Sequence, residues 1–112
     1  MKDRELLELA AKAAGIEGEW RELRSGSRDH FNQIRYKRRN AFVAKGIVFD
    51  PLADDGDALR LAVHLGMVVE ITKTDIFAAC FGSCSEPAGC NPLQATRRAI
   101  VRAAAEVGKA MP

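Results

Sequence analysis

The stretch from residue 50 to residue 66 constrains the fold more than any other, because it carries both the start and the stop signals of a helix. After a proline turn, Asp54 can accept hydrogen bonds from the free N–H groups of a first helical turn. Asp55 and Asp57 add negative charge at the positive end of the helix dipole. Gly66 is the residue type that ends helices in the left-handed conformation. We therefore predict a central helix that Asp54 caps and Gly66 terminates.

The apolar residues of this helix recur with helical spacing. The predicted buried stripe contains Leu59, Ala62, Val63 and Gly66, widened by Ala58, Leu61 and Leu65. The acidic residues at its start have a second interpretation as a magnesium site, because hard cations prefer carboxylates. An EF-hand loop is excluded by spacing, since no glutamate stands at its twelfth position. Helix capping already accounts for these aspartates, so we predict neither a metal site nor a cofactor.

Residues 50–63 also resemble the central segment of small proteins of tailed temperate phages and prophages, broadly the NinX-like accessory group. Residues 3–16 and 95–108 are similar to the flanking parts, so the resemblance covers about half of the chain. Such relatives often carry Trp-Asn-Pro-Leu where this chain has residues 49–52, Phe-Asp-Pro-Leu, which keeps an aromatic and a capping residue. The group offers no catalytic residues to transfer. The resemblance implies a phage or prophage accessory protein and no chemistry.

Length and composition predict one globular domain over residues 1–112. The chain has 112 residues, 47% of them hydrophobic and 29% charged, with a net charge of +2. That size and balance suit one modest core. No apolar run reaches the length of about 18 residues that predicts a membrane span, and the acidic, amphipathic start lacks the apolar core of a secretion signal. We expect a cytoplasmic protein that does not associate with membranes.

The order of predicted elements defines the fold class. Helices are predicted over residues 3–14 and 91–109, in addition to the central one, with Asn91 and Pro92 as start signals of the last. Residues 67–72 and 76–81 predict an antiparallel hairpin. Residues 16–23 can form a strand, residues 25–27 a turn, and 40–44 with 47–49 either an antiparallel pair or one bent strand. The result is an α+β fold, an antiparallel sheet with about three helices packed on it in the order α-β-α-ββ-α.

Residues 21–45 form the most polarised segment. They contain eight basic and two acidic residues, a local charge of +6, so the remainder of the chain is net acidic. Such a cluster can neutralise phosphates, with Phe31 or Tyr36 stacking on bases. It can equally meet an acidic protein surface or form a solvated hairpin that faces the acidic start of the central helix. The candidate partner-binding or nucleic-acid-binding residues are Arg28, Arg35, Tyr36, Lys37, Arg38 and Arg39.

Other candidate residues favour structural roles. Trp20, the only tryptophan, is a residue type that is usually buried in the fold but also anchors interfaces. Three residues separate Cys80 from Cys84, and five separate Cys84 from Cys90. A zinc knuckle usually has two residues between its cysteines, so this spacing does not predict a zinc site even with His64 as a fourth ligand. A disulfide is disfavoured in the cytosol. We therefore predict free thiols and a histidine of no chemical role.

Three functions from different classes follow. The favoured one is a non-enzymatic accessory protein that binds and modulates a host component, with a host protein as its partner. The first alternative is a nucleic-acid or nucleotide binder that uses the basic segment. The second is a small metal-dependent enzyme that uses the aspartates or the cysteines. An exposed edge strand would also offer a second copy of the chain a pairing site, and hence a homodimer.

Overall fold

The computed structural model describes residues 2–28, 30–80 and 83–112, and for residues 24, 25, 27, 28 and 34–38 it describes the backbone alone. Over these residues it contains three helices and two three-stranded antiparallel sheets, which confirms the α+β fold. In chain order the elements are α1 (Asp3–Ala13), β1 (Glu19–Arg28), β2 (Ile34–Ala44), β3 (Ile47–Phe49), α2 (Asp55–His64), β4 (Val68–Ile71), β5 (Asp75–Ala79), β6 (Ser83–Pro87) and α3 (Pro92–Ala110).

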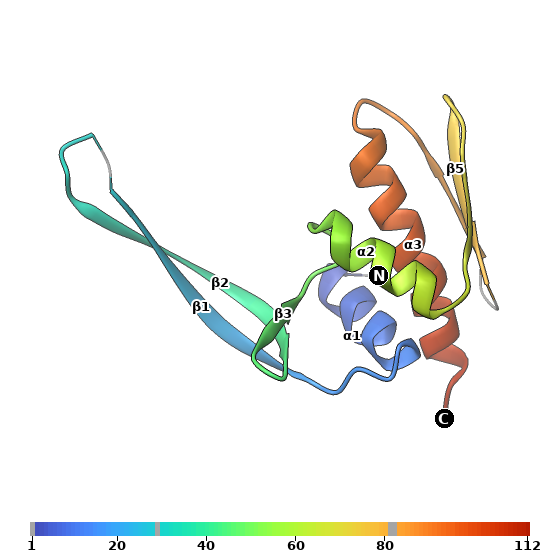
Figure 1. Ribbon diagram of the computed structural model, residues 1–112, viewed down its shortest axis with the longest axis horizontal. Helices are drawn as coiled ribbons and strands as arrows, with labels where there is room; N and C mark the ends of the chain where they lie inside the picture. Colours follow the sequence, from blue (N-terminus) through green and yellow to red (C-terminus); the bar gives the residue numbers. More distant parts are fainter. Residues whose placement is uncertain (1, 29, 81–82) are drawn as a thin grey trace.

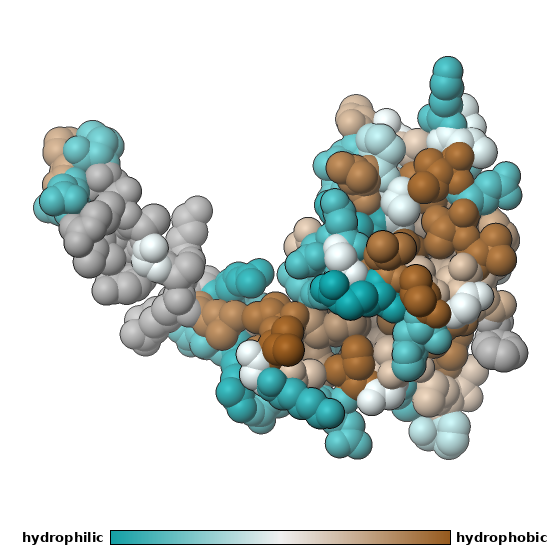
Figure 2. All heavy atoms as spheres, in the orientation of Figure 1, coloured by the Kyte–Doolittle hydropathy of each residue, from teal (hydrophilic) through white to brown (hydrophobic). Residues whose placement is uncertain are grey.

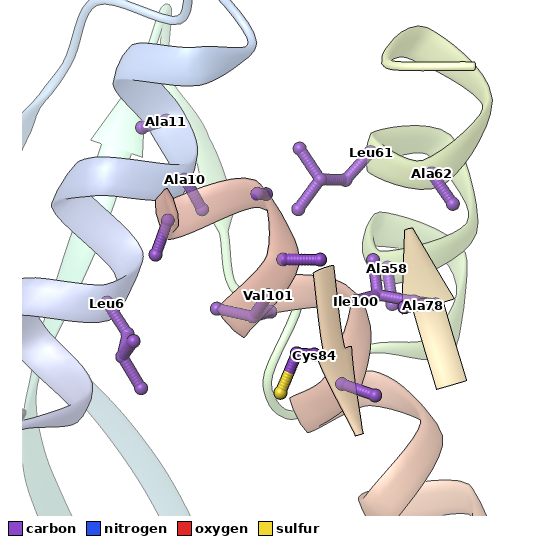
Figure 3. Packing of buried hydrophobic residues seen from close by; sticks show 14 of the residues in the cluster. Leu6, Ala10, Ala11, Ala58, Leu61, Ala62, Ala78, Cys84, Ile100 and Val101 are labelled. Carbon is purple, nitrogen blue, oxygen red and sulfur yellow. The ribbon is translucent and has the colours of Figure 1, made fainter. Parts of the chain in front are cut away.

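Helix α3 is the central element of the body. It packs against α1, α2, β5 and β6 (Figure 1). The side that it buries is built from small residues, Ala99, Ala103, Ala104, Ala105 and Gly108, together with Ile100 and Val101. Small side chains let neighbouring backbones approach closely, and the core between the helices and the second sheet is correspondingly rich in alanine (Figure 3).

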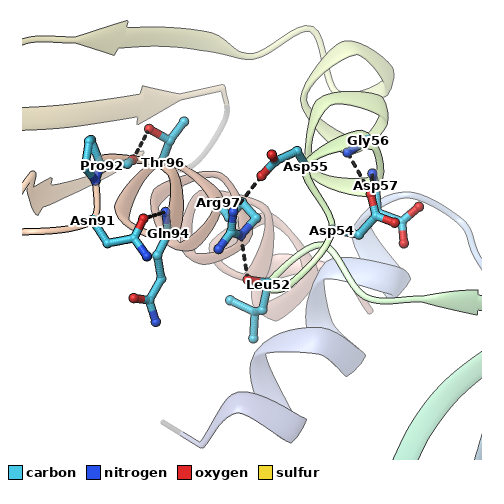
Figure 4. Close-up of polar contacts among 10 residues, drawn as sticks. All are labelled: Leu52, Asp54, Asp55, Gly56, Asp57, Asn91, Pro92, Gln94, Thr96 and Arg97. Atoms are coloured by element: carbon cyan, nitrogen blue, oxygen red, sulfur yellow. Dashed lines mark hydrogen bonds and ion pairs between the residues drawn. The ribbon is translucent and has the colours of Figure 1, made fainter. Parts of the chain in front are cut away.

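The helix ends follow the predicted local chemistry. Asp54 Oδ1 accepts hydrogen bonds from the backbone N–H groups of Gly56 (2.8 Å) and Asp57 (3.2 Å), and Asn91 Oδ1 accepts from Gln94 N (3.1 Å) (Figure 4). Gly66 has a φ of 62°. The N–H of the next residue, Met67, donates to the carbonyl of Ala62 at 2.9 Å. This is the pattern in which a left-handed residue closes a helix.

The buried side of α2 differs from the prediction. Ala58, Leu61 and Ala62 are buried, whereas Leu59 and Val63 keep 64% and 72% of their surface exposed. The helix is apolar over most of its circumference, so its periodicity did not determine which side meets α3. Leu93 in the first turn of α3 is also exposed, over 62% of its surface.

The first sheet corrects a second prediction. Residues 25–27 were expected to form a turn, but they lie within β1 and pair with residues 35–37 of β2. The chain instead turns within residues 30–33, between the ends of the two strands. Pairing with a long partner strand overrides the weak strand propensity of serine and glycine. Of the two arrangements left open for residues 40–49, the antiparallel pair is confirmed, because β2 pairs with β3.

The second sheet contains the predicted hairpin and one further strand. β4 pairs with β5 from Val68 opposite Ala79 to Ile71 opposite Ile76, as predicted. β6 was not predicted. It pairs with β5 and buries Cys84 against the core. The sequence of β6, Ser-Cys-Ser-Glu-Pro, lacks the β-branched residues that mark strands.

Candidate nucleic-acid interface

Strands β1 and β2 form a two-stranded arm that extends away from the body (Figure 1). Ten consecutive pairs join them, from Glu19 opposite Val43 to Arg28 opposite Ile34, so the ribbon is about 30 Å long at the usual rise per strand residue. The radius of gyration is 15.6 Å, against about 13 Å for a globular chain of this length. The difference agrees with an arm that stands clear of the core.

Aromatic packing anchors the root of the arm. The ring of Phe42 contacts Trp20 at 5.6 Å and Phe49 at 6.2 Å between ring centroids, both nearly edge to face. Trp20 Nε1 donates to Glu8 Oε1 of α1 at 2.6 Å, and the Arg4 guanidinium lies 4.6 Å from the centroid of its ring. Trp20 is therefore half-buried within the fold, and it joins the arm to α1.

Two glycines allow the backbone to turn and approach closely at this root. A Cβ at Gly18 would lie 2.5 Å from the carbonyl oxygen of Val43 and 2.8 Å from the Phe42 ring, so a larger residue would separate β1 from β2 where the arm begins. Between β2 and β3, Lys45 and Gly46 have φ angles of 51° and 77°. Two consecutive positive φ angles are those of the tight hairpin turn that matches strand twist.

The basic residues of the arm are concentrated in its outer two thirds. Residues 23–39 contain six basic residues and one acidic residue, a net charge of +5, whereas the rest of the chain sums to −3. The backbone register places Arg38 opposite Arg24, and Arg39 opposite Leu23. For the other predicted site residues, Arg28 lies opposite Ile34, Arg35 opposite Ser27, Tyr36 opposite Gly26, and Lys37 opposite Ser25.

The predicted site residues thus lie on one ribbon, although they come from both strands. The side chains of Arg28, Arg35, Tyr36, Lys37 and Arg38 lie outside the described residues. Arg39 is described: its side chain is exposed, and its Nη1 lies 3.7 Å from Asp50 Oδ2. Partial burial is the largest effect on Asp50 and raises the pKa of its carboxyl above 3.8, while the charge of Arg39 opposes that rise.

The tip of the arm carries two adjacent aromatic rings. His30 and Phe31 lie in the turn, with ring centroids 4.1 Å apart and planes inclined by 42°. The next residue, Asn32, has a φ of 62°, a conformation that asparagine adopts more readily than most residues. The exposed fraction of Phe31 is 71%, whereas Phe42 and Phe49 at the root are 7% and 9% exposed.

The aspartates at the start of α2 are used in structural contacts (Figure 4). Asp54 caps the helix, and Asp55 accepts a hydrogen bond from Arg97 Nη1 at 2.6 Å. Asp57 accepts one from the backbone N–H of Asp50 at 2.9 Å. They line an open acidic hollow of about 490 Å³. Among the described residues, no three histidine, cysteine, aspartate or glutamate side chains come together as a metal site would need.

The cysteines and His64 lie apart from the arm. Cys84 is buried, Cys80 is half-buried and Cys90 is exposed, and all three are free thiols. Burial is the largest effect on Cys84 and raises the pKa of its thiol, which lowers its nucleophilicity at neutral pH. His64 is exposed in the last turn of α2. These positions fit the predicted free thiols.

A second notable surface is apolar. Figure 2 shows hydrophobic residues gathered on the face of the body over α2 and beside the second sheet. A groove of about 370 Å³ lies there between α2, β4 and α3, and its rim includes the exposed side chains of Leu59, Ile71 and Leu93. β4 is also an edge strand of its sheet. The groove was not predicted, because it depends on which side of α2 faces inward.

The comparisons with known proteins add no assignment. No protein-family model, curated protein or solved structure matches this chain. The resemblance to NinX-like accessory proteins therefore stays a prediction that rests on three stretches of sequence. In the part of the chain that the structure describes, no helix combines the length and the apolar character needed to cross a bilayer.

Proposed function

We propose that this protein binds nucleic acid through the β1–β2 arm and that its role is non-enzymatic. The observation that carries the proposal is the net charge of +5 on residues 23–39 of a ribbon that stands clear of a net acidic body. Neutralising phosphates releases condensed counterions, which is the main source of affinity for a basic surface of this kind. The net negative charge of the body would repel phosphates, so nucleic acid would contact the arm alone.

The dimensions of the arm favour double-stranded DNA. Two-stranded β-ribbons bind in the grooves of B-DNA, in some proteins the major groove and in others the minor groove. The ribbon length of about 30 Å is close to one turn of the duplex, about 34 Å. Basic residues on both strands would then lie within reach of phosphates on both sides of the groove. The proposed ligand is therefore a DNA duplex.

An accessory protein that binds and modulates a host component, the function favoured from the sequence, is compatible with this proposal. The host component would then be nucleic acid or a protein bound to it. An acidic host protein is the second candidate, because the same charge favours it. A pull-down of the tagged protein from bacterial lysate, with and without nuclease, separates them: a protein retained at near-equal amount after nuclease treatment supports the second candidate and removes the first.

The direct test compares two charge-reversal variants in binding to a labelled DNA duplex. The arm variant carries Arg35→Glu, Lys37→Glu and Arg38→Glu. The control carries Lys2→Glu, Lys73→Glu and Lys109→Glu, three exposed positions on the body with the same change in net charge. We expect the arm variant to lose more than about tenfold in affinity and the control to lose much less. Equal losses would mean that net charge alone governs binding and would remove the arm from the proposal.

A further inference from the structure

The tip of the arm exposes an apolar ring at the point farthest from the body. Phe31 lies in the turn between Arg28 and Ile34, the last paired residues of the ribbon. Its exposed fraction of 71% contrasts with the buried phenylalanines at the root. Leaving apolar surface in water is unfavourable in proportion to its area. The exposed ring therefore raises the free energy of the unbound protein, and contact with a ligand would lower it.

The local backbone presents this ring in a restricted way. The left-handed conformation of Asn32 closes the turn directly after Phe31, and the His30 ring lies against Phe31 with a centroid separation of 4.1 Å. Both residues are exposed. The tip therefore presents two adjacent exposed rings, and the strands that adjoin it carry the basic residues.

Apolar wedges of this size act on stacked bases. Phenylalanine, leucine and isoleucine side chains insert between base pairs, partly unstack them and kink the duplex. A basic segment behind the wedge holds the arm on phosphates while the ring meets the base edges. Pyrimidine–purine steps unstack most easily, so they are the steps that a tip ring would select.

We propose that Phe31 is a wedge that inserts between adjacent base pairs of the bound duplex, preferentially at pyrimidine–purine steps. This inference rests on the proposed nucleic-acid function and deepens it. The basic residues supply affinity without reading sequence, whereas Phe31 supplies deformation of the duplex and a preference for flexible steps. His30 supports the ring from one side.

The test uses the full chain and a DNA duplex with 2-aminopurine at a central TA step, whose fluorescence rises when its stacking is lost. We expect the unsubstituted protein to raise the fluorescence. Phe31→Ala should abolish that rise and weaken binding about tenfold, the value of one lost base–aromatic contact, with the salt dependence of binding retained. Phe31→Leu should restore part of the rise, because leucine is also a wedge residue.

The matched control is Phe77→Ala, which removes a half-exposed phenylalanine on β5, in the body. It should leave both fluorescence and affinity unchanged. Salt-dependent binding without a fluorescence rise in the unsubstituted protein would overturn the wedge and leave the proposed function standing. An unchanged rise in Phe31→Ala would do the same. Absence of binding at any salt concentration would overturn both proposals together.

Discussion

Arg39 Nη1 lies 3.7 Å from Asp50 Oδ2, and this ion pair joins the inner half of the arm to the turn that precedes α2. The side chain of Arg39 is 60% exposed, whereas that of Asp50 is only 24% exposed. Asp50 also anchors the turn through its backbone, since its carbonyl accepts from Asp54 N at 2.8 Å. The arm and the helical body are therefore coupled through one partly buried carboxylate.

Replacing Asp50 with asparagine should give a stability difference that depends on pH. Burial raises the pKa of Asp50 in the folded protein, so the unfolded chain loses this proton first as the pH rises. The contribution of Asp50 to stability therefore falls as the pH rises from about 3.8 through its folded pKa. An asparagine side chain at this position does not titrate, so the variant has no such loss.

Urea unfolding of Asp50→Asn and the unsubstituted protein between pH 3 and pH 7 measures this difference. We expect the free energy of unfolding of Asp50→Asn to increase relative to the unsubstituted protein as the pH rises, and to level off near neutrality. Asp55→Asn is the control, because the Asp55 carboxylate is 64% exposed and its ion-pair partner is Arg97. A relative decrease for Asp50→Asn would mean that the Arg39 pair outweighs burial.

Gly108→Ala should destabilise the protein although alanine is the better helix former. A Cβ at position 108 would lie 2.8 Å from the carbonyl carbon of Leu9 in α1, closer than van der Waals contact allows. Helix propensity alone predicts a gain of about 1 kcal/mol, and overpacking predicts a loss of about 1–3 kcal/mol. We expect a net loss in the free energy of unfolding.

The control for this substitution is Ala110→Gly, at an exposed position in the same turn of α3. It measures the propensity effect without the contact to α1 and should cost at most about 1 kcal/mol. A Gly108→Ala protein that is more stable than the unsubstituted one would show that the two helices separate easily, contrary to the tight α1–α3 packing.

The three thiols should react with a maleimide in the order of their exposure. Cys90 is exposed, Cys80 is half-buried and Cys84 is buried with a raised thiol pKa. A raised pKa lowers the thiolate fraction, and the thiolate is the reactive form. At pH 7.5 we expect Cys90 to be labelled first and Cys84 only in denaturant, as peptide mass spectrometry would show. Labelling of Cys84 as fast as Cys90 in the folded protein would contradict its burial.

Local signals in the sequence predicted the helix ends well. Asp54, Asn91 and Gly66 act within one turn of their own positions, through hydrogen bonds that do not depend on distant parts of the chain. The central helix, the last helix and the β4–β5 hairpin were therefore found with nearly correct bounds. Features that depend on which distant segments meet were not found in this way.

The errors have such non-local causes. The exposure of Leu59 and Val63 depends on the position of α3, and β6 depends on pairing with β5. Gly26 lies in a strand because Tyr36 is opposite it. The sequence marked the basic residues of the candidate site. It did not show that they share a projecting ribbon with Phe31 at its tip, because that requires the register of the two strands.

The salt dependence of binding to a DNA duplex tests the central claim most directly. Affinities measured from 50 to 200 mM salt should fall linearly on logarithmic axes, and the slope should be shallower by about 3 in the arm variant Arg35→Glu, Lys37→Glu, Arg38→Glu, roughly 0.9 for each lost phosphate contact. The body control should keep the slope of the unsubstituted protein. Binding that is independent of salt, or a slope that is the same in all three proteins, would contradict the assignment of the arm as a nucleic-acid interface.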